Sequence, residues 1–232
     1  EMIRMERLLK DFLEMVQIPS PSRKEGQFAA YLQKKLTELG FRVVIDQQAG
    51  QAAGSETGNL IGYLPGKNGN AQTIMFSAHL DTVTPCQSIN PQDKGEIICT
   101  DGTSILGADD KAGIAAILEA VRHLQEENIP HGPLEVVFTV CEEVGLLGSR
   151  YLDYSLVQAD CGYVLDGGGE PGTIINRGPA QDKLKAVIRG RAAHAGINPE
   201  DGISAIQVAA KAIAEMNSLR IDAETTANIG YI

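Results

Sequence analysis

Leu134-Glu-Val-Val-Phe-Thr-Val-Cys141 is a nearly continuous apolar run, and Glu142 and Glu143 follow it directly. A second run of this kind, Cys161-Gly-Tyr-Val-Leu165, is followed by Asp166. Nearly unbroken apolar strands are typical of sheets that are covered on both faces. The two runs therefore predict the interior of an α/β sheet, with acidic side chains where the strands end.

Helical and strand-like segments precede these runs. Apolar residues recur at helical spacing from Met5 to Val16, restart from Phe28 to Leu39, and line one face of Lys111 to Gln125. Short β-rich runs, separated by Gly, Asn and Pro clusters, lie at 41–45, 59–64, 73–78 and 96–99. We expect a three-layer α/β domain over residues 1–177, with a central mixed, mostly parallel sheet.

The sequence changes character after Asp166, where Gly-Gly-Gly-Glu-Pro-Gly forms a flexible corner. Beyond it we expect a smaller α+β unit over residues 178–232, with a boundary near Arg177 to Pro179. Its expected elements are a strand at 182–190, a helix at 203–219 and a strand at 227–232. We expect this second unit to be incomplete in this chain, because its last strand would lack a partner.

Composition excludes several classes of function. The 232 residues are 43% hydrophobic and 22% charged, which is ordinary for a globular protein. A formal charge of −10, with no cluster of lysine and arginine, argues against a nucleic-acid partner. No apolar run is long enough for a membrane span and no signal-peptide pattern opens the chain, so we expect a cytoplasmic protein without a membrane partner.

The four cysteines, Cys86, Cys99, Cys141 and Cys161, show no C-x-x-C spacing. A thiol nucleophile would need a nearby base, which the sequence does not place. We expect buried free thiols.

His79 and Asp81 follow the β-rich run 73–78. In an extended segment residues i and i+2 point the same way, so Asp81 could hold one ring nitrogen of His79 while the other nitrogen faces a metal. The same pair is also typical of a strand-end histidine that a neighbouring aspartate satisfies.

Asp109 and Asp110 lie where a loop enters the helix predicted from Lys111. Asp110 is the natural cap for that helix, because a carboxylate can accept a hydrogen bond from a free backbone N–H. Asp109 is then left for another task, and a carboxylate has two oxygens that can bridge two cations.

Glu142 and Glu143 would face opposite ways on a regular strand, so they can serve one site only if the chain is already turning, which Gly145 allows. Two adjacent like charges also repel unless a cation or a shared proton relieves them. A solvated acidic loop is the alternative for this pair, and a turn aspartate is the alternative for Asp166.

His194 lies in the second unit, inside Gly190-Arg-Ala-Ala-His-Ala-Gly196. The small residues around this imidazole would let a ligand or another chain approach closely. A lone surface histidine is the alternative.

In this order, the motifs HLDT, GADDKAG, EE-x-G, LDGG and GRAAHAG resemble the M20 family of dinuclear zinc peptidases. They lie in register over residues 74–202. The stretches SAHLDTV, ILGADDKAGIAAILEA and CEEVGLLGS are most similar to the tripeptidase T-like branch. The resemblance implies that His79 and Asp166 bind one zinc ion, that Asp109 bridges both ions, and that Glu143 binds the second.

The resemblance also implies the remaining roles. Asp81 would orient His79, Glu142 would be the general base, and His194 would reach the substrate from a lid domain, often that of a dimer mate. The implied reaction is cleavage of a peptide bond in short peptides, as in a tripeptide aminopeptidase. The implied cofactors are two divalent ions, Zn²⁺ before Co²⁺ or Mn²⁺, and the implied assembly is a homodimer through the lid.

The chain departs from the family pattern at one ligand. The family's second zinc takes a further histidine from the last part of the catalytic domain, and no histidine follows His194 here. We therefore expect this chain to be part of a longer protein. Two alternatives stay open: an N-acyl amino-acid amidohydrolase on the same scaffold, and a catalytically silent binding or dimerisation protein.

Overall fold

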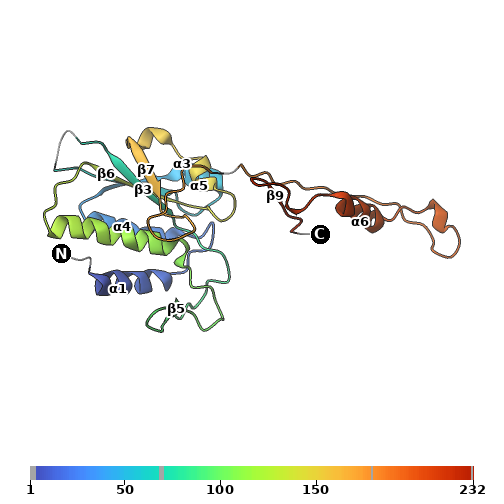
Figure 1. Cartoon of the computed structure of the whole chain (residues 1–232), viewed down its shortest axis with the longest axis horizontal. Helices are drawn as coiled ribbons and strands as arrows, with labels where there is room; N and C mark the ends of the chain where they lie inside the picture. The colour runs from blue at the N-terminus through green and yellow to red at the C-terminus, as the bar shows by residue number, and fades with distance from the viewer. Residues whose placement is uncertain (1–3, 68–70, 179, 231) are drawn as a thin grey trace. The chain divides into compact units, whose positions relative to one another are not determined.

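The chain divides into two compact units, Glu1–Ile174 and Ile175–Ile232 (Figure 1). The structure is a computed structural model, and it describes residues 4–67, 71–178, 180–230 and 232. Pro179, in the expected domain boundary, lies outside these residues. The sequence-based division at 177, and the roles given to the two parts, stay predictions.

The first unit is built on a five-stranded mixed sheet with the strand order β1-β2-β6-β3-β7. β1 and β2 pair antiparallel, as do β2 and β6, whereas β3 lies parallel to both β6 and β7. In the parallel part, His79 pairs with Thr139 and Ser77 with Val164, so the carboxyl ends of β3, β6 and β7 meet at one edge. The strands are β1 (Arg42–Asp46), β2 (Asn59–Leu64), β3 (Ile74–His79), β6 (Leu134–Thr139) and β7 (Cys161–Val164).

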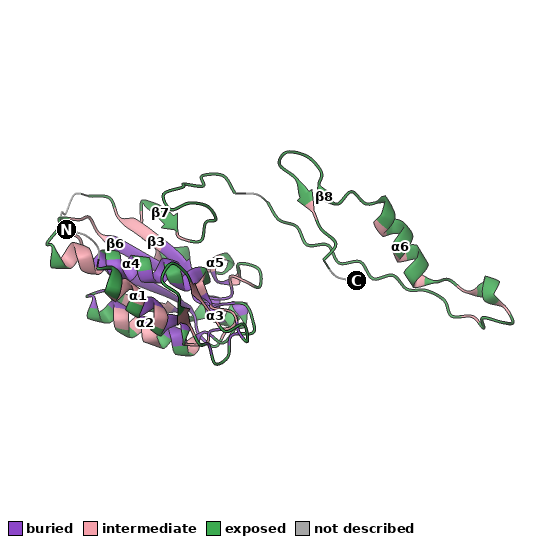
Figure 2. Cartoon of the chain, turned by 60° about the horizontal axis from the view of Figure 1, so that its bottom comes forward, coloured by how far each residue is buried: buried purple, intermediate pink, exposed green. Residues whose placement is uncertain are grey.

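Helices α2 (Gly26–Glu38) and α4 (Ala108–Glu126) pack against this sheet, and α1 (Met5–Val16) lies beside α4 (Figures 1 and 2). α4 contacts β3, α2 contacts β1 and β2, and α1 packs on α4. Buried residues of these helices and of β2 and β6 form the core, and the ribbon is purple at buried residues in Figure 2. Shorter elements complete the unit: α3 (Gln47–Ala53), α5 (Leu147–Arg150), the 3₁₀ helix η1 (Tyr154–Leu156), β4 (Gln92–Asp93) and β5 (Ile98–Cys99).

The structure confirms the α/β class, the mixed sheet and the predicted helices and strands of this unit. All six residues of β6 are buried, as its apolar run predicts. The prediction for β7 was wrong, because its four residues are exposed. β7 lies at the edge of the sheet and pairs with β3 alone among the described strands, so its apolar composition does not reflect burial here.

The four cysteines also differ in burial. Cys86 and Cys141 are buried free thiols, as predicted. Cys99 is half-buried, and Cys161 on β7 is exposed, which corrects the expectation for those two residues.

The second unit contains η2 (Pro199–Asp201), α6 (Ala205–Glu215), β8 (Leu219–Arg220) and β9 (Thr226–Ala227). The predicted helix is confirmed, and Ser204 caps it by accepting a hydrogen bond from Gln207 N at 3.2 Å. The predicted strand at 182–190 was wrong: these residues are exposed and find no strand partner within the described part of the unit. Of the strand predicted at 227–232, only Ala227 lies in β9, and Tyr231 lies outside the described residues.

No helix that the structure describes is both long and apolar enough to span a membrane.

Candidate metal centre

His79 is the last residue of β3, and both of its ring nitrogens are engaged. Nδ1 lies 2.7 Å from the backbone carbonyl oxygen of Asp81, which can only accept, so Nδ1 carries the hydrogen. Nε2 lies 2.9 Å from Oδ1 of Asp109. In the neutral ring Nε2 presents a lone pair to a carboxylate oxygen, and a proton or a metal cation must relieve that contact.

Asp81 is fully buried. We expected its carboxylate to hold the His79 ring, but the backbone carbonyl of Asp81 makes this contact instead. Oδ1 is 3.7 Å from His79 Nδ1, whereas it accepts the Glu142 N–H at 2.8 Å. Oδ2 accepts the Ser22 hydroxyl at 2.6 Å and the Glu143 N–H at 3.2 Å. β3 ends at His79, so the alternation of side chains along a strand does not extend to Asp81.

Asp110 caps helix α4 as predicted, since its Oδ1 accepts the Gly113 N–H at 3.2 Å. Non-helical backbone angles at Asp109 and Asp110 separate these residues from the regular turns that follow. Burial, together with the neighbouring carboxylates, raises the pKa of Asp110 to about 7. The Asp109 side chain is 71% exposed, so the site opens to solvent beside His79.

Glu142 and Glu143 reach one site because the chain turns before them. β6 ends at Thr139, and Cys141 adopts a left-handed backbone with φ of 54°. The turn then closes with Gly145 N and Leu146 N donating to the Glu142 carbonyl at 3.0 and 2.8 Å. A left-handed residue other than glycine costs about 1–2 kcal/mol, so other contacts must hold Cys141 in place. The sequence pointed to Gly145 as the turning residue, but the reversal starts at Cys141.

The structure brings the predicted residues of the first unit together in two overlapping groups. One group is His79, Glu142 and Asp166, and the other is His79, Asp109 and Glu143. In each group the candidate ligand atoms all lie within 4.8 Å of one another. His79 has one nitrogen left, so it can bind a single ion. Glu142, expected from the resemblance to act as a base, therefore also lies within ligand distance.

The cluster is rich in unneutralised negative charge. Within the described ranges, no lysine or arginine forms an ion pair with Asp109, Glu142, Glu143 or Asp166. Burial first, and then the adjacent carboxylates, raise the pKa values of Glu142, Glu143 and Asp166. An imidazole nitrogen and carboxylate oxygens at this spacing suit zinc and similar divalent ions. Such ions would relieve the repulsion between the carboxylates. The residues present therefore fit a metal centre.

The pKa of His79 is also raised. Burial alone would lower it, but the hydrogen bond with Asp109 and the negative charges of Asp81 and Asp166 outweigh burial. A cation at Nε2 would replace the proton that these carboxylates favour.

His194 is placed within the second unit only. It is exposed, and its Nδ1 accepts the Gly196 N–H at 3.2 Å. Its role at the cluster stays a prediction.

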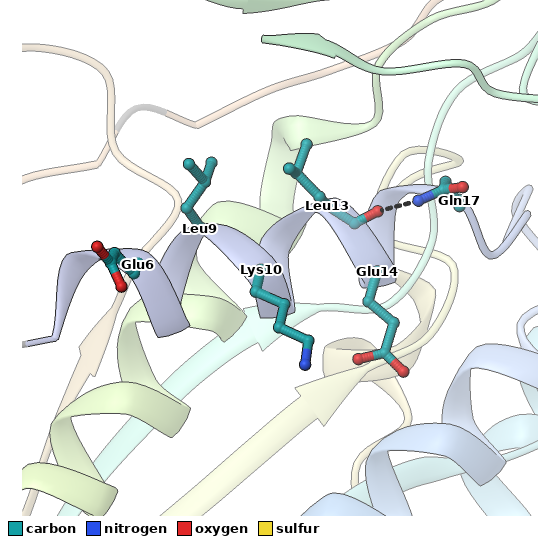
Figure 3. Close-up of a pocket in the computed structure, with 6 residues that line it drawn as sticks. All are labelled: Glu6, Leu9, Lys10, Leu13, Glu14 and Gln17. Carbon is teal, nitrogen blue, oxygen red and sulfur yellow. Dashed lines mark hydrogen bonds between the residues drawn. The ribbon is translucent and has the colours of Figure 1, made fainter. Parts of the chain in front are cut away.

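A separate shallow hollow lies on the outer face of α1 (Figure 3). It is lined by residues of α1 and its C-cap, and Gln17 donates to the Leu13 carbonyl there at 2.8 Å. None of the candidate metal ligands lines it.

Sequence reasoning missed Ser22, Glu25 and Lys111. Ser22 donates to Asp81, Lys111 is buried in α4, and the fully buried Glu25 contacts Cys141 at the turn. Ser22-Arg-Lys-Glu25 does match the spacing of a helix capping box, which could have drawn attention to this segment.

The sequence of residues 59–205, more than half of the chain, matches the model of peptidase family M28. The chain belongs to this peptidase family. A curated relative, the uncharacterized protein YqjE of Bacillus subtilis strain 168, is 48% identical over 229 residues, 99% of this chain and 61% of the relative. The chain therefore spans less than two thirds of that relative's length.

Two crystal structures share the fold over the whole chain. An aminopeptidase PepT from Bacillus cereus is 45% identical, with a TM-score of 0.82, and a tripeptidase from Staphylococcus aureus is 38% identical, with a TM-score of 0.88. The chain covers 62% and 61% of these two proteins. A more distant structure of the same fold, 19% identical with a TM-score of 0.54, is an M20 family metallo-carboxypeptidase from Sulfolobus solfataricus. The peptidase T-like M20 fold implied by the motifs is therefore confirmed, although the family model that matches is the one named M28.

Proposed function

We propose that this chain carries most of the metal centre of a hydrolase that cleaves a peptide bond in short peptides. The observation that supports this most strongly is the pair of ligand groups that share His79, because within each group the candidate ligand atoms lie within 4.8 Å of one another. The cluster lies at the carboxyl ends of parallel strands, where α/β sheets bind their ligands.

In this proposal two divalent ions, most favourably Zn²⁺, occupy the cluster. His79 and Asp166 would be ligands of one ion, Glu143 would be a ligand of the other, and the exposed carboxylate of Asp109 would be a ligand shared by both. When bound, such ions polarise a carbonyl and make a water more acidic.

Glu142 is the proposed general base. Its carboxylate is held beside the ligands by the hydrogen bond from its backbone N–H to Asp81. The raised pKa of Glu142, caused mainly by burial, suits a group that takes a proton from water and returns it to the leaving amine. His194 would donate a hydrogen bond to the oxyanion from the second unit.

A tripeptide is the proposed substrate, because two solved structures that share the fold over the whole chain are described as an aminopeptidase and a tripeptidase. We also propose a homodimer formed through the second unit. The metal ligands do not report the substrate, so an acetyl-amino acid is the natural comparison in any assay.

The test is hydrolysis of a tripeptide by the wild-type protein and by Glu142→Gln, with and without a chelator. We expect chelation to abolish hydrolysis and Glu142→Gln to lower the rate about 10²–10⁴-fold while the protein still binds metal. Glu127→Gln, an exposed residue at the end of α4, is the control and should be active. An unchanged rate in Glu142→Gln would refute the assigned base, and cleavage of an acetyl-amino acid in preference to a tripeptide would refute the assigned substrate.

A further inference from the structure

Glu25 is a fully buried acid with no lysine or arginine partner among the residues that the structure describes. It occupies the N-cap position of α2, yet its side chain makes no capping hydrogen bond to that helix. A buried carboxylate without a cation is costly, so its hydrogen bonds must explain why it is there.

Those hydrogen bonds lead to the turn before Glu142. Oε1 of Glu25 accepts the Cys141 N–H at 3.0 Å and the Cys141 thiol at 3.4 Å. The same oxygen accepts the Arg23 N–H at 2.9 Å, and Oε2 accepts the Ser55 hydroxyl at 2.6 Å. The carboxylate therefore has donors on both oxygens, and one of them is the left-handed residue that turns the chain out of β6.

Two buried carboxylates accept hydrogen bonds from successive backbone N–H groups of this turn. Glu25 takes the N–H of Cys141, and Asp81 takes those of Glu142 and Glu143. Three consecutive N–H groups are thus fixed by side chains from two distant parts of the sequence. A carboxylate suits this arrangement because it only accepts hydrogen bonds and can take several at once.

We propose that Glu25 is a positioning residue that sets the direction of Glu142 and Glu143 by holding the Cys141 N–H. The inference rests on the proposed function for its effect on hydrolysis, but not for its effect on the turn. The hydrogen bonds of the Glu25 carboxylate go to Cys141, Arg23 and Ser55 and to none of the candidate ligands, so its proposed effect runs through the backbone of residues 141–143.

The test compares Glu25→Gln with Glu25→Asp. Gln keeps the length of the side chain and an oxygen for the Cys141 N–H, and Ser55 can turn its hydroxyl to accept from the new amide. Asp keeps the charge but shortens the reach by one methylene. If Glu25 acts by positioning, Glu25→Gln should keep the turn and the hydrolytic rate, and Glu25→Asp should lose both. If only its negative charge matters, the two variants should show the reverse.

Glu135 provides the matched control. It is also a buried acid that accepts backbone N–H groups, from Gln158 and Ala159, but it lies at the opposite end of β6 from the site. Glu135→Asp should therefore lower stability without altering the turn.

The first readout is hydrogen exchange of the Cys141, Glu142 and Glu143 amides in the metal-free protein. We expect exchange at least about tenfold faster in Glu25→Asp, and close to wild type in Glu25→Gln and Glu135→Asp. Unchanged exchange of these amides in Glu25→Asp would overturn the proposal. This readout needs no activity, so it stands apart from the proposed function.

The second readout is tripeptide hydrolysis at saturating metal, together with the affinity of the metal-free protein for Zn²⁺. In Glu25→Asp we expect kcat and Zn²⁺ affinity each to fall about 10–100-fold, with KM within about threefold of wild type. Equal losses of kcat in Glu25→Asp and Glu135→Asp would overturn the proposal, because the effect would then be general destabilisation. Faster amide exchange in Glu25→Asp, in a wild-type protein that cleaves no peptide, would support the positioning role and refute the proposed function.

Discussion

At the scale of single residues, Lys111 shows how a buried charge can organise the chain. Its side chain is fully buried, and Nζ donates to the carbonyls of Ile18 at 2.6 Å and Met15 at 3.2 Å. Nζ also lies 4.4 Å from the centre of the Phe28 ring. Lys111 thereby fixes the end of α1 and the segment that leads to Ser22 and Glu25.

We expect Lys111→Met to destabilise the protein by about 1–3 kcal/mol, because the Ile18 carbonyl loses its donor, whereas the Met15 carbonyl still accepts the Ile18 N–H at 3.1 Å. The loss is limited because the lysine itself is costly to bury, as its pKa, lowered by burial to about 8, indicates. Chemical denaturation measures the change. Lys10→Met, on the exposed side of α1, is the control and should change stability by less than about 0.5 kcal/mol. Wild-type stability in Lys111→Met would contradict this role.

The free thiols provide a second prediction at this scale. Burial, reinforced by Glu25, raises the pKa of Cys141 to about 12, whereas Cys161 is exposed. We expect a disulfide reagent at pH 8 to modify Cys161 quickly in the folded protein and Cys141 only after unfolding. The Cys161→Ser protein should lose the fast phase. Rapid labelling of Cys141 in that variant would show that the turn is open.

The sequence predicted the residues that meet at the cluster better than the contacts that hold them. His79, Asp109 and Asp166 could be grouped because each follows or adjoins a predicted element whose end lies at the same edge. Glu25 could not be placed, because its main partner is a backbone N–H, which every residue except proline possesses. Such a contact leaves no mark on the partner's residue type.

At the scale of elements, the loop between β6 and α5 depends on the start of β2. Asn59 is buried there, and its side chain accepts the Val140 N–H at 3.0 Å and donates to the Gly148 carbonyl at 2.9 Å. It thereby ties together the two ends of the loop that carries Glu142 and Glu143. Gly148 also packs too closely for a side chain, since a Cβ would lie 2.3 Å from the Val140 oxygen.

We expect Asn59→Ala to destabilise the protein by about 1–3 kcal/mol, since two buried backbone groups lose their partner. Thermal and urea unfolding measure this loss. The control is Asn90→Ala, in an exposed loop, which should stay within about 0.5 kcal/mol of wild type. If Asn59→Ala matched this control, the loop would be held by other contacts.

Element prediction succeeded where apolar periodicity was strong, as in α1, α4 and β6. α3 was missed because Gln47–Ala53 has no apolar stripe, although Asp46 caps it by accepting the Ala49 N–H at 3.1 Å and Gly54 ends it with φ of 72°. The strand predicted at 182–190 failed for a different reason. An extended segment becomes a strand only when a neighbour pairs with it, and sequence pattern does not supply that neighbour.

At the scale of the whole molecule, negative charge is concentrated at the candidate metal centre, where no described lysine or arginine forms an ion pair with the ligands. The chain carries a formal charge of −10, and four carboxylates among the described residues lie within ligand distance of His79: those of Asp109, Glu142, Glu143 and Asp166. The lysines and arginines that do form ion pairs lie elsewhere, for example between α1 and α4, where Arg7 pairs with the buried Glu119 at 2.7 Å. Divalent cations would supply positive charge that the protein's own lysines and arginines do not bring to the cluster.

Calorimetric titration of Zn²⁺ into the metal-free protein measures this directly, with Asp109→Asn as the test variant and Glu127→Gln as the control. We expect two ions per chain in the wild type and the control, and at most one in Asp109→Asn, which loses the bridging carboxylate. Absence of saturable Zn²⁺ binding by the wild-type protein, or identical stoichiometry in Asp109→Asn, would contradict a dinuclear centre at this cluster.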